Sequence, residues 1–374
     1  MKILKIPRLL IYTLVIILTL TACGKKLPEL TPEQAHAADT LGIDREILRE
    51  LMAKPLYEFS ERDIDIYLPY LQYTVPDLQE RIRHLARKNL GQPYDIYLLG
   101  EYPVEIYDEQ PLYNLKESDC VVFVEHTVSM ALARDWQSFF AILQRLRYMD
   151  GIISYTTRNH YGEYDWPENN TWLAKDISAR LAGERVGTDT TKVNKTNFFM
   201  KRGVPYTLPE DSLIWAYIPI EIMPEMFDKL QTGDIVNVVR GYKNQKWVGH
   251  YGFVMVDEDG GVNFLHSTAP QVIEQDFPEL VQLLMAANAE KAEKNAELEL
   301  VNAEIKAHNA LFPDSMRVYE PYLTQTLGYR FLRINEDPLG NLLEDGQELQ
   351  LRVVPVTPQA VKTTKRDSVL NGLK

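Results

Sequence analysis

Helix signals and strand signals occupy different parts of this chain, and their order limits the folds that it can adopt. Helices are expected to begin at Pro32, behind a Thr31 cap, and to occupy residues 76–89. A third helix is expected to run from Cys120 to about residue 134, with a wide apolar face. Strands are expected over 152–156, 235–240, 250–256, 262–266 and 329–334. Helices followed by antiparallel strands indicate an α+β fold, with a helical half packed on an antiparallel sheet or barrel.

The N-terminus has the pattern of an export signal. Three basic residues in the first eight precede an uncharged run at 9–22, which is shorter than the roughly 20 residues of a membrane-spanning helix. The run ends in Leu20-Thr21-Ala22-Cys23-Gly24, which resembles the lipobox of bacterial lipoproteins. Cleavage is therefore expected to leave Cys23 as a lipidated N-terminus that anchors the protein to a membrane. A plain apolar N-terminus with an incidental cysteine is the alternative.

The charge balance and the cysteine count narrow the possible partners and chemistry. Asp and Glu number 53 against 40 Lys and Arg, which gives a net charge of -13 and argues against nucleic-acid binding. With Cys23 lipidated, Cys120 is the only free thiol of the exported protein. A free thiol in an oxidising compartment is expected to be either buried or reactive.

The candidate chemistry gathers around Cys120. If a helix begins there, its positive N-terminal end is expected to lower the pKa of the thiol from about 8.5 toward neutrality. His250 stands at the start of an apolar strand between glycines, and His266 ends the next strand, so a base and a group that orients it are expected side by side. Each residue alone has an ordinary structural explanation. No third metal ligand falls at a suitable spacing near the histidines, so we expect no metal and no cofactor.

These residues resemble a known family. Gly249-His250-Tyr251-Gly252-Phe253, together with Asp119-Cys120, resembles the NlpC-type papain-like cell-wall hydrolases. A narrower resemblance, over about residues 78–334, is to the N-acetylmuramoyl-L-alanine amidase-like family, once called domain of unknown function 1460. It is carried by Leu90-Gly91-Gln92-Pro93-Tyr94, residues 119–125, Arg147-Tyr148, residues 158–161 and Asp165-Trp166.

The resemblance implies a papain-like fold and cleavage of the amide between muramic acid and L-alanine in muropeptides, during peptidoglycan turnover or recycling. By matching position, Cys120 would be the nucleophile, His250 the base and His266 the orienter. The substrate would be a peptidoglycan fragment, and the location would be the bacterial cell envelope, on the outer membrane facing the periplasm.

Residues 158–166 form a candidate substrate-binding segment. They combine a cation, an amide, an imidazole, a carboxylate and aromatic rings, which suits a sugar lactyl ether and a peptide backbone. The candidate substrate-binding residues are Tyr94, Asp119, Arg158, Asn159, His160, Tyr161, Asp165 and Trp166. The alternative is a surface turn anchored by a buried Trp166.

The sequence suggests a division into a signal peptide, a tether, a catalytic domain and flanking regions. The parts are a lipoprotein signal peptide at 1–22, a lipidated tether at 23–33, a helical region at 34–75, a papain-like amidase domain at 76–358 and a flexible tail at 359–374. Within the domain, residues 279–312 lack Gly and Pro and predict a protruding helix. We favour a solvated arm over a coiled coil that binds a protein partner, because the helix face that would contact a partner is mostly alanine.

Two alternatives to the amidase remain open. One is a D-glutamyl-diamino acid endopeptidase on the same fold. The other is a non-catalytic lipoprotein that binds peptidoglycan and docks a partner on the arm. The presence of Cys120, His250 and His266 together favours an enzyme.

Overall fold

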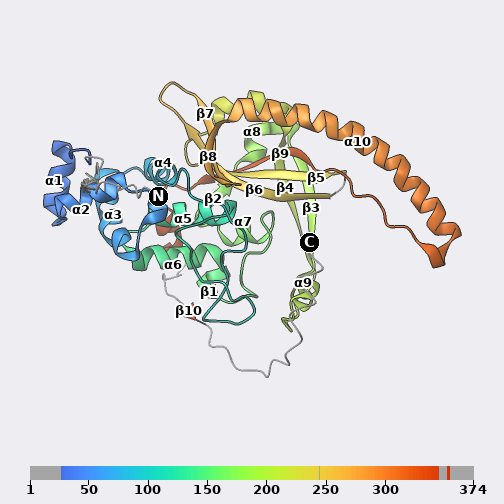
Figure 1. Ribbon diagram of the computed structural model, residues 1–374, viewed down its shortest axis with the longest axis horizontal. Coiled ribbons are helices and arrows are strands. Elements are labelled where there is room, and N and C mark those ends of the chain that lie inside the picture. Colours follow the sequence, from blue (N-terminus) through green and yellow to red (C-terminus); the bar gives the residue numbers. More distant parts are fainter. Residues whose placement is uncertain (1–26, 244, 345–351, 354–374) are drawn as a thin grey trace, which may run out of the picture.

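The computed structural model describes residues 27–243, 245–344 and 352–353 (Figure 1). About 47% of the chain is helical and 23% is strand, which confirms the α+β expectation. The expected signal peptide, the lipidation site Cys23 and the tail at 359–374 lie outside the described residues. Among the helices that are described, none has the length and apolar character needed to cross a membrane.

The N-terminal helices form one packed group. Their bounds are α1 Pro32–Leu41, α2 Arg45–Ala53, α3 Glu61–Thr74, α4 Leu78–Lys88, α5 Cys120–Leu132 and α6 Trp136–Arg147. The cap at Thr31 forms as predicted. The Thr31 side chain accepts a hydrogen bond from the Gln34 N–H, and the Gln34 side chain accepts one from the Thr31 N–H. The predicted starts near residues 76 and 120 are confirmed by α4 and α5.

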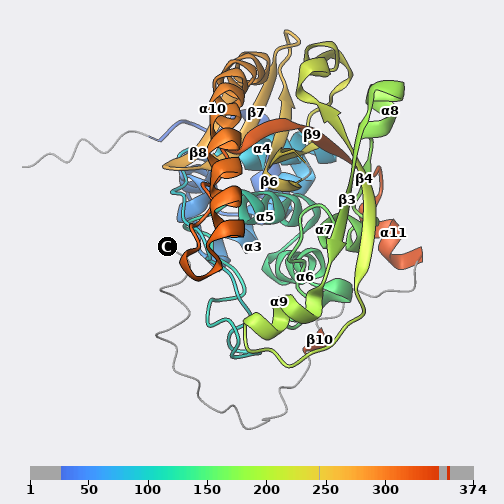
Figure 2. The ribbon, with the colours of Figure 1, turned by 90° about the vertical axis from the view of Figure 1, so that its right-hand side faces the viewer.

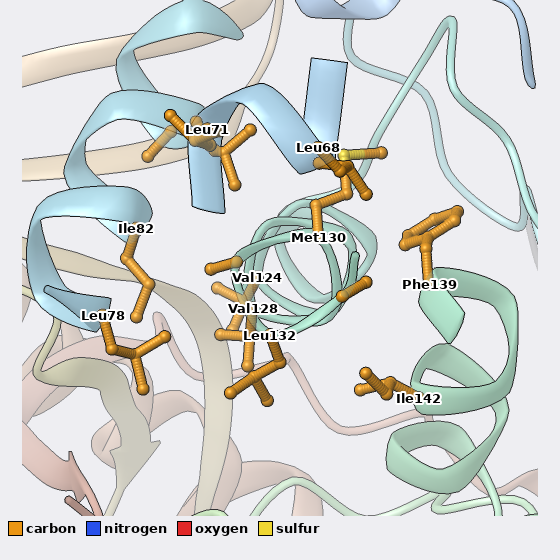
Figure 3. Close-up of a cluster of buried hydrophobic side chains, with 14 of the residues drawn as sticks. Leu68, Leu71, Leu78, Ile82, Val124, Val128, Met130, Leu132, Phe139 and Ile142 are labelled. Carbon is orange, nitrogen blue, oxygen red and sulfur yellow. The ribbon is translucent and has the colours of Figure 1, made fainter. Parts of the chain in front are cut away.

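Helix α5 is the central helix of this group. All of its residues from Val122 to Leu132 are buried. Figure 3 shows Val124, Val128 and Met130 of α5 surrounded by side chains from α3, α4 and α6. Burial of apolar side chains on every side fixes the helix firmly. Its first residue, Cys120, is therefore held on a rigid element.

The strands form one antiparallel sheet in the order β3-β4-β9-β5-β6-β7-β8, with β2 paired to β9. Their bounds are β2 Ala174–Asp176, β3 Gly187–Val193, β4 Asp211–Pro219, β5 Ile235–Tyr242, β6 Gln245–Val256, β7 Val262–Thr268, β8 Gln271–Asp276 and β9 Gln325–Ile334. The predicted strand at 152–156 is reduced to β1 Ile152–Ile153, which pairs with β10 Arg352–Val353. Strands β2, β3, β4, β8 and β10 were not predicted. Short helices complete the body: α7 Asp165–Asn169, α8 Ser178–Ala182, α9 Lys195–Lys201 and α11 Pro338–Glu344.

Two apolar layers cover the two faces of the sheet. Phe253 and Leu265 pack with Phe123 of α5, and the Phe123 and Phe253 rings lie 5.8 Å apart. Phe264 belongs to the opposite layer and stacks on Phe277 of the helix α10 Phe277–Leu311. Because side chains alternate along a strand, His266 lies on the face of Phe264, where the two rings stack at 4.3 Å.

Helix α10 confirms the predicted protruding helix and extends beyond the body (Figures 1 and 2). Four of its asparagines, spaced by seven residues, each clasp the backbone C=O and N–H of one residue in the returning chain. The pairs are Asn288 with Thr326, Asn295 with Leu323, Asn302 with Glu320 and Asn309 with Arg317. Seven helical residues rise about 10.5 Å and three extended residues about 9–10 Å, so the two spacings match. The arm is thus a helix joined along its length to an extended segment of the returning chain.

Candidate active site

Cys120 begins α5, and Asp119 is the cap that starts this helix. One carboxylate oxygen of Asp119 accepts the backbone N–H groups of Val121 at 2.9 Å and Val122 at 2.8 Å. The Cys120 side chain is half-buried. Asp119 was a candidate substrate ligand, but the structure gives it the role of positioning the helix start.

The loop before Cys120 is tied to the strand that carries His266. Ser118 donates from its hydroxyl to Gln92 at 2.9 Å, and Ser267 donates from its hydroxyl to the Ser118 carbonyl at 2.8 Å. Ser118 and Ser267 are both fully buried. These contacts hold the loop before Cys120 against β7, one residue after His266.

The two histidines form a hydrogen-bonded chain that ends at Gln275. Nε2 of His250 lies 2.7 Å from Nδ1 of His266, and Nε2 of His266 lies 3.0 Å from the side-chain oxygen of Gln275. Because an amide oxygen only accepts, Nε2 of His266 carries its proton, and Nδ1 of a neutral His266 then accepts from Nε2 of His250. The chain therefore leaves Nδ1 of His250 with a free lone pair. Gln275 was missed from the sequence, although pairing of β8 with β7 places it opposite Phe264, on the face of His266.

A β-bulge precedes His250. His250 pairs with Val238 of β5 while Val248 pairs with Val239, so Gly249 has no partner in β5. A bulge re-aims the neighbouring side chain. A Cβ on Gly249 would lie 2.7 Å from Cδ of Arg240, so only glycine admits the arginine side chain that crosses this position.

The thiol does not have the low pKa that its place at a helix start predicted. Burial, with a smaller contribution from the Asp119 carboxylate, raises the pKa of Cys120 to about 12, although the backbone N–H groups of Tyr251 and Val121 act in the opposite direction. Burial also lowers the pKa of His250 to about 3, with smaller contributions from His266 and Arg240. The expectation was wrong because desolvation exceeds the helix N-terminal effect. At neutral pH the resting pair is a neutral thiol and a neutral imidazole.

Cys120 lies beside the backbone N–H of Tyr251, the residue after His250, and is not hydrogen-bonded to the His250 ring. Cys120 packs in the layer of α5, and the N–H of Tyr251, the residue after His250, stabilises its thiolate form. Within the described ranges, no hydrogen bond joins the thiol of Cys120 to the imidazole of His250. Catalytic hydrogen bonds are often long in free enzymes and tighten around substrate.

Tyr94 is placed beside Cys120. Burial raises the pKa of its hydroxyl, and electrostatic interactions with Cys120 and Asp119 add to the effect. Its backbone N–H donates to the Pro270 carbonyl at 3.0 Å, at the turn between β7 and β8. The structure therefore brings Tyr94 to Cys120, as expected of a residue that contacts the substrate.

Arg158 is held in an internal ion-pair network. Its guanidinium lies 3.0 Å from a carboxylate oxygen of Glu101 and 3.0 Å from one of Asp108, and it packs 4.7 Å from the centroid of the Tyr155 ring. Its side chain is 14% exposed and that of Glu101 is fully buried. The charge of Arg158 is thus already neutralised inside the protein.

The rest of the segment 158–166 is also engaged internally. Asn159 donates to the Leu146 carbonyl, the His160 ring is bonded to the Tyr155 carbonyl, and the Tyr161 ring packs on Phe198. Asp165 accepts the N–H groups of His160 and Tyr161 and pairs with Lys195.

Trp166 anchors the segment. It is 2% exposed, and its indole N–H donates to Glu125 at 3.0 Å. Glu125 in turn pairs with Arg147 at 2.8 Å. Trp166 was a candidate substrate-binding residue, but its ring is buried, which agrees with the alternative of a turn anchored by a buried Trp166.

The superposition on one solved structure supports this architecture. A Legionella pneumophila protein of the domain of unknown function 1460 superposes with a TM-score of 0.55 at 19% identity, over 73% of this chain and 95% of its own. At this identity the similarity concerns the fold alone. An N-acetylmuramoyl-L-alanine amidase from Bacteroides uniformis superposes with a TM-score of 0.46 at 19% identity, over 69% of this chain and 99% of its own.

The family comparison extends beyond the fold. No curated protein matches the chain. The sequence profile of one family matches residues 84–285, more than half of the chain, and this range includes Tyr94, Cys120, His250 and His266. The chain belongs to the N-acetylmuramoyl-L-alanine amidase-like family.

Proposed function

We propose that the protein is a cysteine amidase that hydrolyses the N-acetylmuramoyl-L-alanine bond of muropeptides. The observation that carries the proposal is the chain from Gln275 through His266 to His250, which leaves Nδ1 of His250 as a base near a cysteine at a helix start. Membership of the amidase-like family supports the choice of bond. A protein that only binds peptidoglycan has no use for an oriented base and a free thiol.

The first half of the reaction forms a thioester. Nδ1 of His250 takes the proton of the Cys120 thiol as Sγ attacks the lactyl carbonyl carbon, and the carbonyl oxygen becomes an oxyanion. We assign the stabilisation of that oxyanion to the hydroxyl of Tyr94, which is near Cys120, and to the backbone N–H of Cys120. His250 then gives its proton to the nitrogen of L-alanine, the C–N bond breaks, and the peptide leaves with a free amine.

The second half returns the enzyme to its starting state. His250 takes a proton from a water molecule as the water attacks the thioester carbonyl. The C–S bond breaks, the thiolate recovers a proton from His250, and the muramic acid leaves with a free carboxyl group. His266 accepts a hydrogen bond from the Nε2–H of His250 throughout. It therefore orients the base and transfers no proton itself.

Burial of the site determines the order of these events. Because burial raises the pKa of Cys120 and lowers that of His250, an ion pair is disfavoured before substrate arrives. Proton transfer therefore accompanies attack, and the thiolate forms only as its charge passes to the substrate oxygen.

We further propose that the enzyme works in the bacterial cell envelope, held by lipid on Cys23. The pattern of basic residues, an apolar run and a lipobox-like end supports this location. Expression of the full chain with a radiolabelled fatty acid should label the native protein and leave the Cys23→Ala variant unlabelled. Equal labelling of the two proteins would refute the anchor.

Product identification tests the bond that is cleaved. A muropeptide that carries its sugar should release a peptide beginning with L-alanine, as read by mass spectrometry. The sugar-free tripeptide should remain intact. Products that begin with the diamino acid would instead show a D-glutamyl endopeptidase.

A further inference from the structure

We propose that Arg240 and Trp247 form a subsite beside His250 that binds a carboxylate on the peptide side of the substrate. The inference rests on the proposed amidase function and names the group that the amidase recognises. Its basis is the register of three neighbouring strands and the set of unpaired donors that this register brings together.

Two adjacent rows of cross-strand partners lie on one face of the sheet. His250, Val238 and Tyr329 form the first row across β6, β5 and β9. Trp247, Arg240 and Thr326 form the second row across the same strands. Directly paired residues share a face, and positions two apart on a strand are about 7 Å apart. Arg240 and Trp247 are therefore immediate neighbours of the catalytic histidine.

Arg240 and Trp247 converge over the bulge at Gly249. A Cβ at that glycine would lie 2.7 Å from Cδ of Arg240 and 3.1 Å from Nε1 of Trp247. Both side chains therefore reach toward the same point, one residue before His250. The absence of a side chain at Gly249 leaves room for this approach.

The charge of Arg240 is available to a ligand. Arg240 is exposed, and no carboxylate of residues 27–243 or 245–344 forms an ion pair with it. This contrasts with Arg158 and Arg147, whose charges are neutralised by buried carboxylates. The protein has a net charge of -13, so the positive charge of Arg240 beside His250 offers a local site of attraction for an anionic group. Burial dominates the pKa shifts of His250, Tyr94 and Tyr329, and the positive charge of Arg240 acts on all three rings.

Two further donors accompany the guanidinium. Trp247 is 38% exposed, and its indole N–H has no acceptor among the residues whose placement is described. Tyr329 is 1% exposed, and its hydroxyl is one of the buried polar groups that lack a partner in the same part of the chain. A buried hydroxyl without a partner is costly, so a bound group that satisfies it is favoured.

The chemistry of these donors selects a carboxylate. A guanidinium and an indole N–H donate and do not accept, so a carboxylate oxygen pair is the natural complement. The peptide released by the amidase carries such a group two residues from the scissile bond, where D-glutamate linked through its side chain keeps a free α-carboxylate. The sugar side of the substrate has no free carboxylate until the amide is cut. Arg240 therefore binds the leaving peptide.

Binding measurements on an inactive protein test the subsite separately from catalysis. Isothermal titration calorimetry of the Cys120→Ala protein compares two ligands, N-acetylmuramoyl-L-alanyl-D-glutamate and its analogue with a carboxamide at the α position. We expect the carboxylate ligand to bind about thirtyfold more tightly, the usual size of one charge-assisted hydrogen bond. Adding Arg240→Gln should remove this preference and leave the affinity for the carboxamide unchanged.

Control variants separate the subsite from general effects. Arg134→Gln, an exposed arginine just beyond the far end of α5, should keep the full preference. Trp247→Phe keeps the ring and removes the N–H, so it should reduce the preference by about threefold to tenfold. Equal affinity for the two ligands, or a preference that survives Arg240→Gln, would overturn the subsite. Failure of the native protein to release an L-alanine-first peptide would instead overturn the amidase function, and the binding ratio would still decide the subsite.

Discussion

Replacing Arg158 by Ala should destabilise the protein and leave the chemistry of the site intact. The Arg158 guanidinium is the cation 3.0 Å from Glu101, whose side chain is fully buried. Removing one partner of a buried ion pair leaves the other charge uncompensated, at a cost of about 3–5 kcal/mol. Asp108 is more exposed and should contribute little to this cost. A segment that contacted the substrate through Arg158 would instead lose catalytic efficiency with no loss of stability.

The pH dependence of this loss has a definite sign. Burial raises the pKa of Glu101 even with Arg158 present, so its acid form is favoured in the folded state. Without Arg158 the pKa rises further. A group whose pKa is raised on folding stabilises the protein below its unfolded pKa, and that stability is lost as pH rises through the folded pKa. The deficit of Arg158→Ala relative to the native protein should therefore be small at pH 4 and large at pH 8.

Urea unfolding of the two proteins, followed by tryptophan fluorescence at both pH values, measures this directly. Arg185→Ala is the matched control, because Arg185 pairs with Glu225 on the exposed surface, where solvent screens the pair and its loss should barely change stability. Unchanged stability of Arg158→Ala with a thirtyfold fall in kcat/KM would refute the structural role. A deficit that does not depend on pH would refute the assignment to Glu101.

Three further predictions concern the histidine chain and the arm. His266→Ala should lower kcat less than His250→Ala, because an orienter moves no proton; equal losses in steady-state kinetics would contradict the assignment. Gln275→Glu should make kcat fall as pH drops from 9 to 5. The new carboxylate raises the pKa of His266, and a protonated His266 cannot accept a hydrogen bond from His250. A pH profile like that of the native protein would count against the hydrogen-bonded chain of histidines. Asn302→Ala should speed hydrogen exchange at the Glu320 N–H by about tenfold or more, because one clasp of the arm is lost, while amidase activity is kept; unchanged exchange would show that the clasp is dispensable.

Local signals explain what the sequence predicted well. The start of α5 follows from the Asp119 cap and an apolar run, which act within a few residues. The pairing of His250 and His266 follows from two strands joined by a short turn at Gly260. These features need no knowledge of distant parts of the chain.

Long-range packing explains what the sequence did not predict. Residues 158–166 have the composition of a binding segment. The sequence does not reveal that Arg158 forms an ion pair with Glu101, or that the indole N–H of Trp166 donates to Glu125. Strand β8 was missed because Gln271–Asp276 has little apolar alternation, and Gln275 was missed with it. The pKa of Cys120 was predicted with the wrong sign because burial depends on how α5 meets β6.

The asparagine clasps illustrate a third case. Their spacing of seven residues is visible in the sequence, from Asn288 to Asn309. An interval of seven usually indicates a coiled-coil seam. Here the asparagines bind an extended segment of the same chain, and only the fold reveals this contact.

The rate at which Cys120→Ala releases L-alanine-first peptide from a muropeptide is the most direct test of the account. In the proposed mechanism Cys120 supplies the atom that forms the thioester, so the rate should fall by at least about a thousandfold. The circular dichroism spectrum and urea midpoint of the variant should stay close to those of the native protein, because the side chain is half-buried at the helix start. Release of the same peptide at a rate within tenfold of the native protein would contradict the cysteine mechanism.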